Sequence, residues 1–434
     1  MRYQSTRGGG ETELVDAVMR GLAADGGLFV PEELPRFAPQ DFRGNSLAEI
    51  ATELLAPFFA GSSLEGELAA ICGDAFDFPL PLKRVAADLE VLELFHGPTA
   101  AFKDVGARFL AAVMERALAR STDTRPLTIL VATSGDTGGA VAAAFHRRRG
   151  IRVGVLFPKR QVSPRQQHQL TCWGDNIRAF EVTGSFDDCQ ALVKAAFTDA
   201  GLRERHRLTA ANSINIGRIL PQVAYHAAGS LWHWREHGST AGSIIPSGNL
   251  GNGMACVWAR AMGLPVREVV LAVNANRTIP DFLATGQWTP RASVATLASA
   301  MDVGNPSNME RLRNLLPDFA ELRSNVEAYP VDDVEIRAQI AKDHARYGTV
   351  WCPHTATGFW VYDHLPPARK AGRPWIVNAT AHPAKFEAIV EPVIGRVVAV
   401  PPTLAALLAR PTASTPLAPR LADFAAELDS WEQK

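Results

Sequence analysis

One lysine stands in a setting that suits covalent chemistry. Lys103 ends the segment FHGPTAAFK, next to Phe102, in an apolar stretch at the expected start of a helix. Burial lowers the pKa of a lysine, and the neutral amine that results is a nucleophile or a base. Schiff-base chemistry requires such an amine. The segment alone leaves a second reading open, in which Lys103 extends from an exposed helix face and pairs with Asp104.

Two glycine-containing loops are candidates for anion binding. They are Thr133-Ser134-Gly135-Asp136-Thr137-Gly138 and Pro246-Ser247-Gly248-Asn249-Leu250-Gly251-Asn252-Gly253, and each lies between an apolar run and a helical stretch. Glycines let backbone N–H groups approach an anion at the positive end of a helix. The first loop suits a carboxylate or a phosphate, or is a tight capped turn. The second loop favours a phosphate, and its glycine spacing matches neither a nucleotide P-loop nor a dinucleotide fingerprint.

The elements around these loops predict an α/β fold. Short apolar runs such as LTILVA, RVGVLFP and VREVVLAVN alternate with helical stretches, which favours parallel strands joined by crossover helices. Continuous apolar strands are typical of a sheet covered on both faces. The segment from Glu11 to Leu82 is expected to be largely helical, and the tail from Pro401 is expected to form a helix bounded by loops. Ligands bind at the carboxyl ends of such strands, where the two loops lie.

Length and composition limit the class of protein. The 434 residues exceed one ordinary domain, and 47% apolar with 21% charged residues is typical of a globular chain. With 44 basic and 45 acidic side chains there is no broad positive field to hold a nucleic acid. We find no secretory signal and no apolar run that would span a membrane. We therefore expect a cytoplasmic protein that binds a small molecule, and neither nucleic acid nor membrane.

One motif points to a different chemistry. His233-Trp234-Arg235-Glu236-His237 matches the H-x-x-E-H pattern of a zinc peptidase, with its histidines one helical turn apart. A catalytic zinc needs a third protein ligand, and the sequence does not identify one. The charged residues before Gly238 are typical of a solvated helix end. We expect no metal, and the five scattered cysteines predict neither disulfides nor a thiolate site.

Six segments in order carry a family resemblance. HGPTAAFKD, ATSGDTGGA, NSINIGRI, PSGNLGN, MDVGNPSN and TAHPAKF, with the opening YQSTRGGGE, resemble the threonine synthase family of fold type II pyridoxal-phosphate enzymes. The resemblance extends from about residue 3 to residue 386. It implies two open, mostly parallel α/β domains that exchange chain segments. We expect a cap region over 1–92, the lysine-bearing domain over 93–240, and the phosphate-loop domain with a C-terminal helical tail over 241–434.

The resemblance also implies roles for individual residues. Lys103 would bind pyridoxal phosphate as a Schiff base, Asp136 would lie near the ring hydroxyl, and Thr380 would face the pyridine nitrogen. The cofactor phosphate would bind the loop of Ser247, Gly248, Asn249, Leu250, Gly251 and Asn252. The substrate carboxylate would bind Thr133, Ser134 and Thr137, and the candidates for the leaving phosphate are Lys159, Ser163, Asn215 and Arg218. The roles of His382 and Lys385 stay open.

The implied reaction is the conversion of O-phospho-L-homoserine and water to L-threonine and phosphate, by γ-elimination and β-addition of water. Two alternatives stay open from the residues. One is a lyase with the same cofactor that releases a keto acid and ammonia from a phosphorylated amino acid. The other is a non-catalytic protein that keeps the phosphate loop for binding or regulation. A monomer and a homodimer are both compatible with the sequence.

Overall fold

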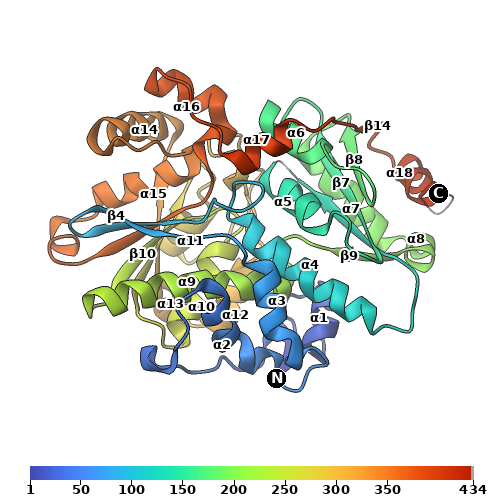
Figure 1. The fold of residues 1–434 in the computed structure, drawn as a ribbon, viewed down its shortest axis with the longest axis horizontal. Helices are drawn as coiled ribbons and strands as arrows, with labels where there is room; N and C mark the ends of the chain where they lie inside the picture. Colours follow the sequence, from blue (N-terminus) through green and yellow to red (C-terminus); the bar gives the residue numbers. More distant parts are fainter. Residues whose placement is uncertain (134, 432–434) are drawn as a thin grey trace.

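The N-terminal region combines helices with a small sheet. The computed structural model describes residues 1–133 and 135–431 (Figure 1). Three short antiparallel strands form this sheet in the order β2-β1-β3. Three α-helices are present, but they cover less than half of the segment from Glu11 to Leu82 that was expected to be largely helical. The sheet was not expected, because strands of three or four residues are too short to show an alternating pattern. The elements are β1 (Arg2–Ser5), β2 (Glu11–Glu13), α1 (Leu14–Arg20), β3 (Phe29–Pro31), α2 (Leu47–Phe59) and α3 (Leu68–Ala75).

A six-stranded sheet forms the larger of two α/β units. Its strand order is β12-β11-β10-β13-β5-β4, and every pair is parallel except β4 with β5. The apolar run VREVVLAVN, which predicted a strand, forms β11 of this sheet. The strands are β4 (Leu82–Ala86), β5 (Leu89–Glu93), β10 (Ala241–Pro246), β11 (Val266–Val273), β12 (Val326–Pro330) and β13 (Trp375–Ala379).

A five-stranded sheet forms the second unit. Its order is β14-β8-β7-β6-β9 and all its pairs are parallel, which confirms the predicted fold class. The strands are β6 (Leu127–Ala132), β7 (Ile151–Pro158), β8 (Ile177–Val182), β9 (Arg207–Ala210) and β14 (Thr415–Leu417).

Both sheets take strands from across the expected domain bounds. Strands β4 and β5, from the region expected to be a cap, join the larger sheet beside β13, and β14 from the C-terminal tail joins the smaller sheet beside β8. The expected exchange of segments is therefore present, and the bounds 1–92, 93–240 and 241–434 stay a prediction. The tail holds two helices and a strand where one helix was expected. Only its pairing with β8 identifies this three-residue strand, which contains a proline.

Helices cover both faces of each large sheet. Helices α9 and α10 pack on one face of the larger sheet and α15 on the other, while α5 and α7 contact the smaller sheet (Figure 1). The helices from α4 onward are α4 (Lys103–Ala119), α5 (Asp136–Phe145), α6 (Pro164–Thr171), α7 (Phe186–Thr198), α8 (Ala200–Arg205), α9 (Ile216–His237), α10 (Gly251–Ala261), α11 (Thr278–Thr285), α12 (Met309–Leu315), α13 (Phe319–Asn325), α14 (Asp333–Tyr347), α15 (Pro353–His364), α16 (Glu387–Ile394), α17 (Pro402–Leu408) and α18 (Leu421–Asp429).

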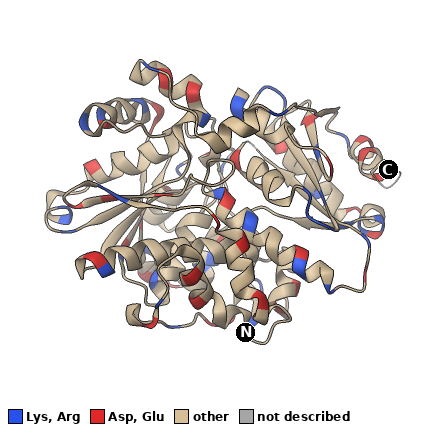
Figure 2. Cartoon of the chain, viewed as in Figure 1, with Lys and Arg blue, Asp and Glu red and all other residues tan. Residues whose placement is uncertain are grey.

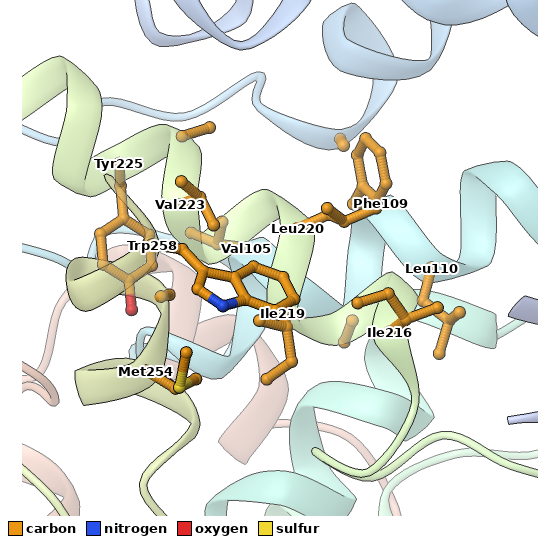
Figure 3. Packing of buried hydrophobic residues seen from close by; sticks show 14 of the residues in the cluster. Val105, Phe109, Leu110, Ile216, Ile219, Leu220, Val223, Tyr225, Met254 and Trp258 are labelled. Carbon is orange, nitrogen blue, oxygen red and sulfur yellow. The ribbon is translucent and has the colours of Figure 1, made fainter. Parts of the chain in front are cut away.

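Three helices share one apolar core. Val105 and Phe109 of α4, Ile219 of α9, and Met254 and Trp258 of α10 are buried together, as Figure 3 shows. Burial of each large apolar side chain contributes about 1.5–3 kcal/mol. This packing fixes α4, α9 and α10 relative to one another, and with them the residues at their N-terminal ends.

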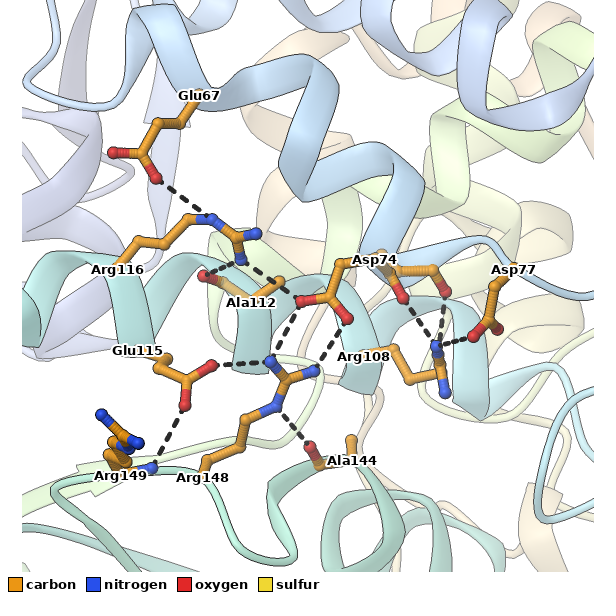
Figure 4. Close-up of polar contacts among 11 residues, drawn as sticks. Glu67, Asp74, Asp77, Arg108, Ala112, Glu115, Arg116, Ala144, Arg148 and Arg149 are labelled. Carbon is orange, nitrogen blue, oxygen red and sulfur yellow. Dashed lines mark hydrogen bonds and ion pairs between the residues drawn. The ribbon is translucent and has the colours of Figure 1, made fainter.

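An ionic network holds the outer face of α4. Asp74 accepts from Arg116 at 3.3 Å and from Arg148 at 3.0 Å, and Arg148 also contacts Glu115 at 2.6 Å (Figure 4). Arg116 reaches back to Glu67 at 3.1 Å. Isolated surface pairs contribute little, but a network orders several side chains together. The network therefore ties α4 to the N-terminal helices and to the segment after α5.

Basic and acidic residues are mixed over the view in Figure 2, as the balanced composition predicts. Within the described residues, no helix combines the length and the apolar character needed to cross a membrane.

Candidate active site

The predicted chemistry converges on one cavity. A cavity of about 330 Å³ opens at the carboxyl ends of β6, β10 and β13. The residue that follows each of these strands lines it, namely Thr133, Ser247 and Thr380. Strand ends of two different sheets thus meet here, which is the expected place for a ligand in this fold class.

Lys103 faces this cavity from the first turn of α4. Its Nζ lies 4.5 Å from the centroid of the Phe102 ring. Burial, and then the charge of the Arg218 guanidinium, lower the pKa of Lys103 to about 8, while Asp136 acts in the opposite direction. Asp104 does not pair with Lys103, because its carboxylate accepts from Thr99 N at 2.8 Å and Thr99 Oγ1 at 2.7 Å. The reading with an exposed lysine paired to Asp104 is therefore wrong.

The loop from Ser247 to Asn252 forms an anion cradle at the start of α10, and all six predicted residues line the cavity. Ser247 Oγ and Asn252 Nδ2 are buried and have no hydrogen-bond partner among the described residues. Asn249 instead anchors the loop, since its Nδ2 donates to Ser213 Oγ at 2.6 Å. A Cβ on Gly248 would lie 2.6 Å from Met301 Cα, so glycine is required there. Unpartnered donors at a helix N-terminus fit a bound phosphate.

The loop before α5 forms a second wall of the cavity. Gly135 has φ +149°, and a Cβ there would lie 2.5 Å from Gln166 Nε2, so this position requires glycine. Thr133 Oγ1 accepts from Gly135 N at 3.0 Å and from Gly138 N at 2.9 Å, so its hydroxyl shapes the loop. Thr133 and Thr137 line the cavity. Ser134, the third predicted carboxylate ligand, lies outside the described residues.

Asp136 carries a buried carboxylate into the cavity. Lys385 Nζ lies 2.7 Å from its Oδ1, and Gln166 Nε2 donates to the same oxygen at 3.0 Å. Burial works to raise the pKa of Asp136, but Lys385 and His354 outweigh it and hold this pKa below its usual value. The sequence did not decide the role of Lys385. In the structure this residue is the ionic partner of Asp136.

Thr380 also lines the cavity. Its Oγ1 is buried and has no hydrogen-bond partner among the described residues, while its N donates to Thr355 Oγ1 at 3.1 Å. A free hydroxyl at this depth costs stability unless a ligand satisfies it. It fits the predicted partner of a pyridine nitrogen.

His354 is a cavity residue that the sequence did not reveal. Its Nε2 accepts from Ala300 N at 3.0 Å, so the proton of the neutral ring is on Nδ1. Burial lowers the pKa of His354 to about 4, which keeps the ring neutral. Nδ1 has no partner among the described residues and offers a donor to the cavity. A single histidine in a helix gives no sequence signal. Further lining residues without a prediction include Asn212, Ser213, Gln222, Arg291 and Asp302.

Of the four candidates for the leaving phosphate, the structure brings only Arg218 to the cavity. Lys159 is exposed. Ser163 caps α6 by accepting from Gln166 N at 3.3 Å, and Asn215 caps α9 by accepting from Gly217 N at 2.9 Å. The placement of Lys159, Ser163 and Asn215 at a phosphate site is therefore not supported. Polar residues before a helix are equally typical of caps, and the sequence did not separate the two roles.

Arg218 is buried, and its guanidinium donates only to backbone oxygens among the described residues. Its Nη1 donates to Ala211 O at 2.5 Å and its Nη2 to Lys103 O at 3.5 Å. Its Nε has no partner, and no carboxylate among the described residues bonds to the guanidinium. Asp104 acts on Arg218 only through its charge, and a buried cation without a hydrogen-bonded anion is costly, so an anionic ligand beside Lys103 would complete this site.

Comparisons with known proteins agree with this geometry. A family model for pyridoxal-phosphate dependent enzymes matches residues 79–378, and models for the threonine synthase N terminus and C-terminal region match 2–76 and 355–426. The threonine synthase of Haemophilus influenzae is 40% identical over 393 residues, which cover 89% of this chain and 90% of that protein.

Two solved structures match along the whole chain. The crystal structure of threonine synthase from Escherichia coli has a TM-score of 0.91 at 34% identity, with 99% of this chain and 100% of that chain covered. The pyridoxal-phosphate-bound threonine synthase from Brucella melitensis has a TM-score of 0.92 at 34% identity, with both chains fully covered at 100%. The chain therefore belongs to the threonine synthase family of pyridoxal-phosphate-dependent lyases.

Proposed function

We propose that the cavity converts O-phospho-L-homoserine and water to L-threonine and phosphate, and that Arg218 binds the phosphate of the substrate. The observation that carries this proposal is the buried Arg218 guanidinium, which has no carboxylate partner among the described residues and lies next to Lys103. The planar guanidinium fork matches phosphate geometry. An anion at this position would offset the cost of burying the cation.

The residues around the cavity divide into holders of the cofactor and holders of the substrate. Lys103 would bind pyridoxal phosphate covalently, the loop Ser247 to Asn252 would hold its phosphate, and Thr380 and Asp136 would contact its ring. When bound, the cofactor supplies an electron sink for the substrate α carbon. Thr137, with the first turn of α5, would hold the substrate carboxylate at a helix N-terminus. His354 Nδ1 supports this arrangement as a further donor in the same cavity.

Lys103 is the proposed catalytic base. Once the substrate amine has replaced it on the cofactor, the freed Nζ of Lys103 would take the proton from the substrate α carbon, and a second proton would leave the β carbon before phosphate departs from the γ carbon. Water then adds at the β carbon, and protons return to the γ and α carbons, which balances the reaction. The lowered pKa of Lys103, about 8, supports this role because a base works best near the operating pH.

One chain supplies the base and both anion sites, so a monomer and a homodimer are both consistent with this reaction.

Product analysis tests the proposal. Purified protein loaded with pyridoxal phosphate is supplied with O-phospho-L-homoserine, and threonine, phosphate and 2-oxobutanoate are measured over time. Equal amounts of threonine and phosphate are expected, and Lys103→Ala should form neither. Phosphate with 2-oxobutanoate and ammonia but without threonine would instead establish the lyase alternative. Borohydride reduction followed by peptide mapping should place the cofactor on Lys103, and a reduced adduct elsewhere would contradict its assignment.

A further inference from the structure

A cluster of titratable side chains lies at the far end of α9, away from the cavity. His233 and His237 are one helical turn apart, and both face Glu90 of β5. His233 Nδ1 lies 2.5 Å from Glu90 Oε2, and His237 Nε2 lies 3.4 Å from Glu90 Oε1. One potential ligand atom from each residue lies within 4.8 Å of the others. Glu90 supplies the third ligand that the H-x-x-E-H motif lacked in the sequence.

The cluster is shielded on one side and open on the other. The side chains of His233 and Glu90 are 2% and 8% exposed, whereas that of His237 is 30% exposed. A separate cavity of about 190 Å³ lies beside them and is lined by all three residues and by Asp88. Solvent therefore reaches the cluster, with space for a water as a fourth ligand.

We propose that Glu90, His233 and His237 form a binding site for a divalent transition metal of the zinc type. Two imidazole nitrogens and a carboxylate oxygen are ligands that zinc accepts in a tetrahedral site with one open position. With bonds of about 2.0–2.1 Å, tetrahedral ligand atoms stand about 3.3 Å apart, and His237 Nε2 already lies 3.4 Å from Glu90 Oε1. His233 Nδ1 contacts the other carboxylate oxygen, Oε2, at 2.5 Å, so the carboxylate or the His233 ring must rotate for one metal to reach both nitrogens and a single Glu90 oxygen.

The arrangement of the two imidazole rings supports a metal. The imidazole rings of His233 and His237 lie 4.6 Å apart between centroids, and both contact the carboxylate of Glu90. The five cysteines are free and buried, and none belongs to this cluster.

The site would be structural and not that of a peptidase. Glu236, the general base of that motif, is 70% exposed and lies 3.8 Å from His237 on its solvent side. At 1.5 Å of rise per residue, about 28 Å of helix separate His237 from Arg218. A metal here would tie the C-terminal end of α9 to the first residues of β5, without contact to the reacting groups.

Metal titration of the holoenzyme tests this site. The protein is freed of metal with a chelator in phosphate-free buffer and titrated with Zn²⁺ by calorimetry and with Co²⁺ by visible absorption. We expect one equivalent to bind, with cobalt bands of a nitrogen and oxygen site and no thiolate charge-transfer band. His237→Gln changes the most exposed ligand and should weaken binding at least about tenfold, whereas the neighbouring Glu236→Gln removes only an exposed charge beside His237 and should weaken it much less. Zn²⁺ should raise the melting temperature of the wild type but not of His237→Gln.

Three outcomes would overturn the proposal. They are no saturable binding to the wild type, binding that survives both His237→Gln and Glu90→Gln, and equal weakening by Glu236→Gln. The first would show that the cluster is a hydrogen-bonded contact between α9 and β5, and the second would place the metal elsewhere in the protein. The third would give Glu236 a role that the geometry does not support.

Discussion

Lys385 Nζ lies 2.7 Å from Asp136 Oδ1, and the two side chains are 0% and 5% exposed. Lys385 also donates to Thr99 O at 2.8 Å, in the segment that leads to Lys103. One buried ammonium thus connects the loop before α5 with the start of α4. The negative charge at the cavity wall depends on this pair, because burial alone works to raise the pKa of Asp136.

Lys385→Met should destabilise the protein strongly. Removal of one partner leaves a buried carboxylate without its cation, which costs about 3–5 kcal/mol of the free energy of unfolding. Urea denaturation of the cofactor-free protein measures this loss. Arg420→Ala, which breaks an exposed pair with Asp423, is the matched control and should change stability little. Equal losses in the two variants would show that the buried pair has no special role.

The same pair has a defined pH dependence. The pKa of Asp136 is lowered in the folded state, so its contribution is present above the unfolded pKa of about 4 and is lost as Asp136 is protonated. In Lys385→Met the pKa of Asp136 should rise, and acid then relieves the unpaired charge. The difference in unfolding free energy between the two proteins should therefore shrink as the pH falls from about 7 toward 4. A difference that grows on acidification would contradict the assignment.

Attachment of pyridoxal phosphate to Lys103 should speed up through pH 8. The pKa of Lys103 is about 8, below its usual 10.5, so the neutral amine predominates above pH 8. Between these values the unfolded chain binds more protons, so Lys103 makes stability rise with pH there. The rate is followed by near-visible absorbance after cofactor-free protein is mixed with pyridoxal phosphate. A rate that levels off only near pH 10 would show that Lys103 is not buried as described.

The variant Arg218→Gln tests which charge helps to lower the pKa of Lys103. After burial, the Arg218 guanidinium is the next cause of the lowered pKa of Lys103. Arg218→Gln should therefore move the midpoint of the rate profile to higher pH. Arg116→Gln, on the outer face of the same helix as Lys103, should leave the midpoint in place.

Gly248→Ala should weaken cofactor binding. Its Cβ would lie 2.6 Å from Met301 Cα, a backbone atom that has little freedom to move, so the anion loop must shift. Equilibrium titration with pyridoxal phosphate measures the affinity. Gly139→Ala is the control, because its Cβ meets no atom closer than 3.5 Å, and it should retain affinity and add about 0.5–1 kcal/mol of stability within α5. Equal affinity in the two variants would show that the loop tolerates displacement.

The sequence predicted features that depend on local pattern. Continuous apolar runs indicated the parallel strands, and glycines between a strand and a helix located the loops that line the cavity. It did not predict contacts that need the folded chain. Nothing near Lys385 in the sequence indicates Asp136. Asn215 looked like a phosphate ligand because a polar residue before a helix suits both roles, and the structure shows that it caps α9. Strand β14 and the meeting of Glu90 with His233 depend on elements far apart in the chain, which no local periodicity encodes.

Arg218→Gln should raise the KM for O-phospho-L-homoserine and leave the cofactor absorbance intact. Loss of a hydrogen bond to a charged group costs about 1.5–3 kcal/mol, or roughly 10–150-fold in KM. Steady-state kinetics at saturating pyridoxal phosphate, at a pH above the attachment midpoint of each protein, separate this effect from the ionisation of Lys103. Arg291 is the other guanidinium that lines the cavity, but it is 54% exposed and pairs with Asp281 at 2.8 Å. Its charge is already compensated, so Arg291→Gln should have the smaller effect. The reverse order of the two variants would move the substrate phosphate from the buried guanidinium to the rim of the cavity.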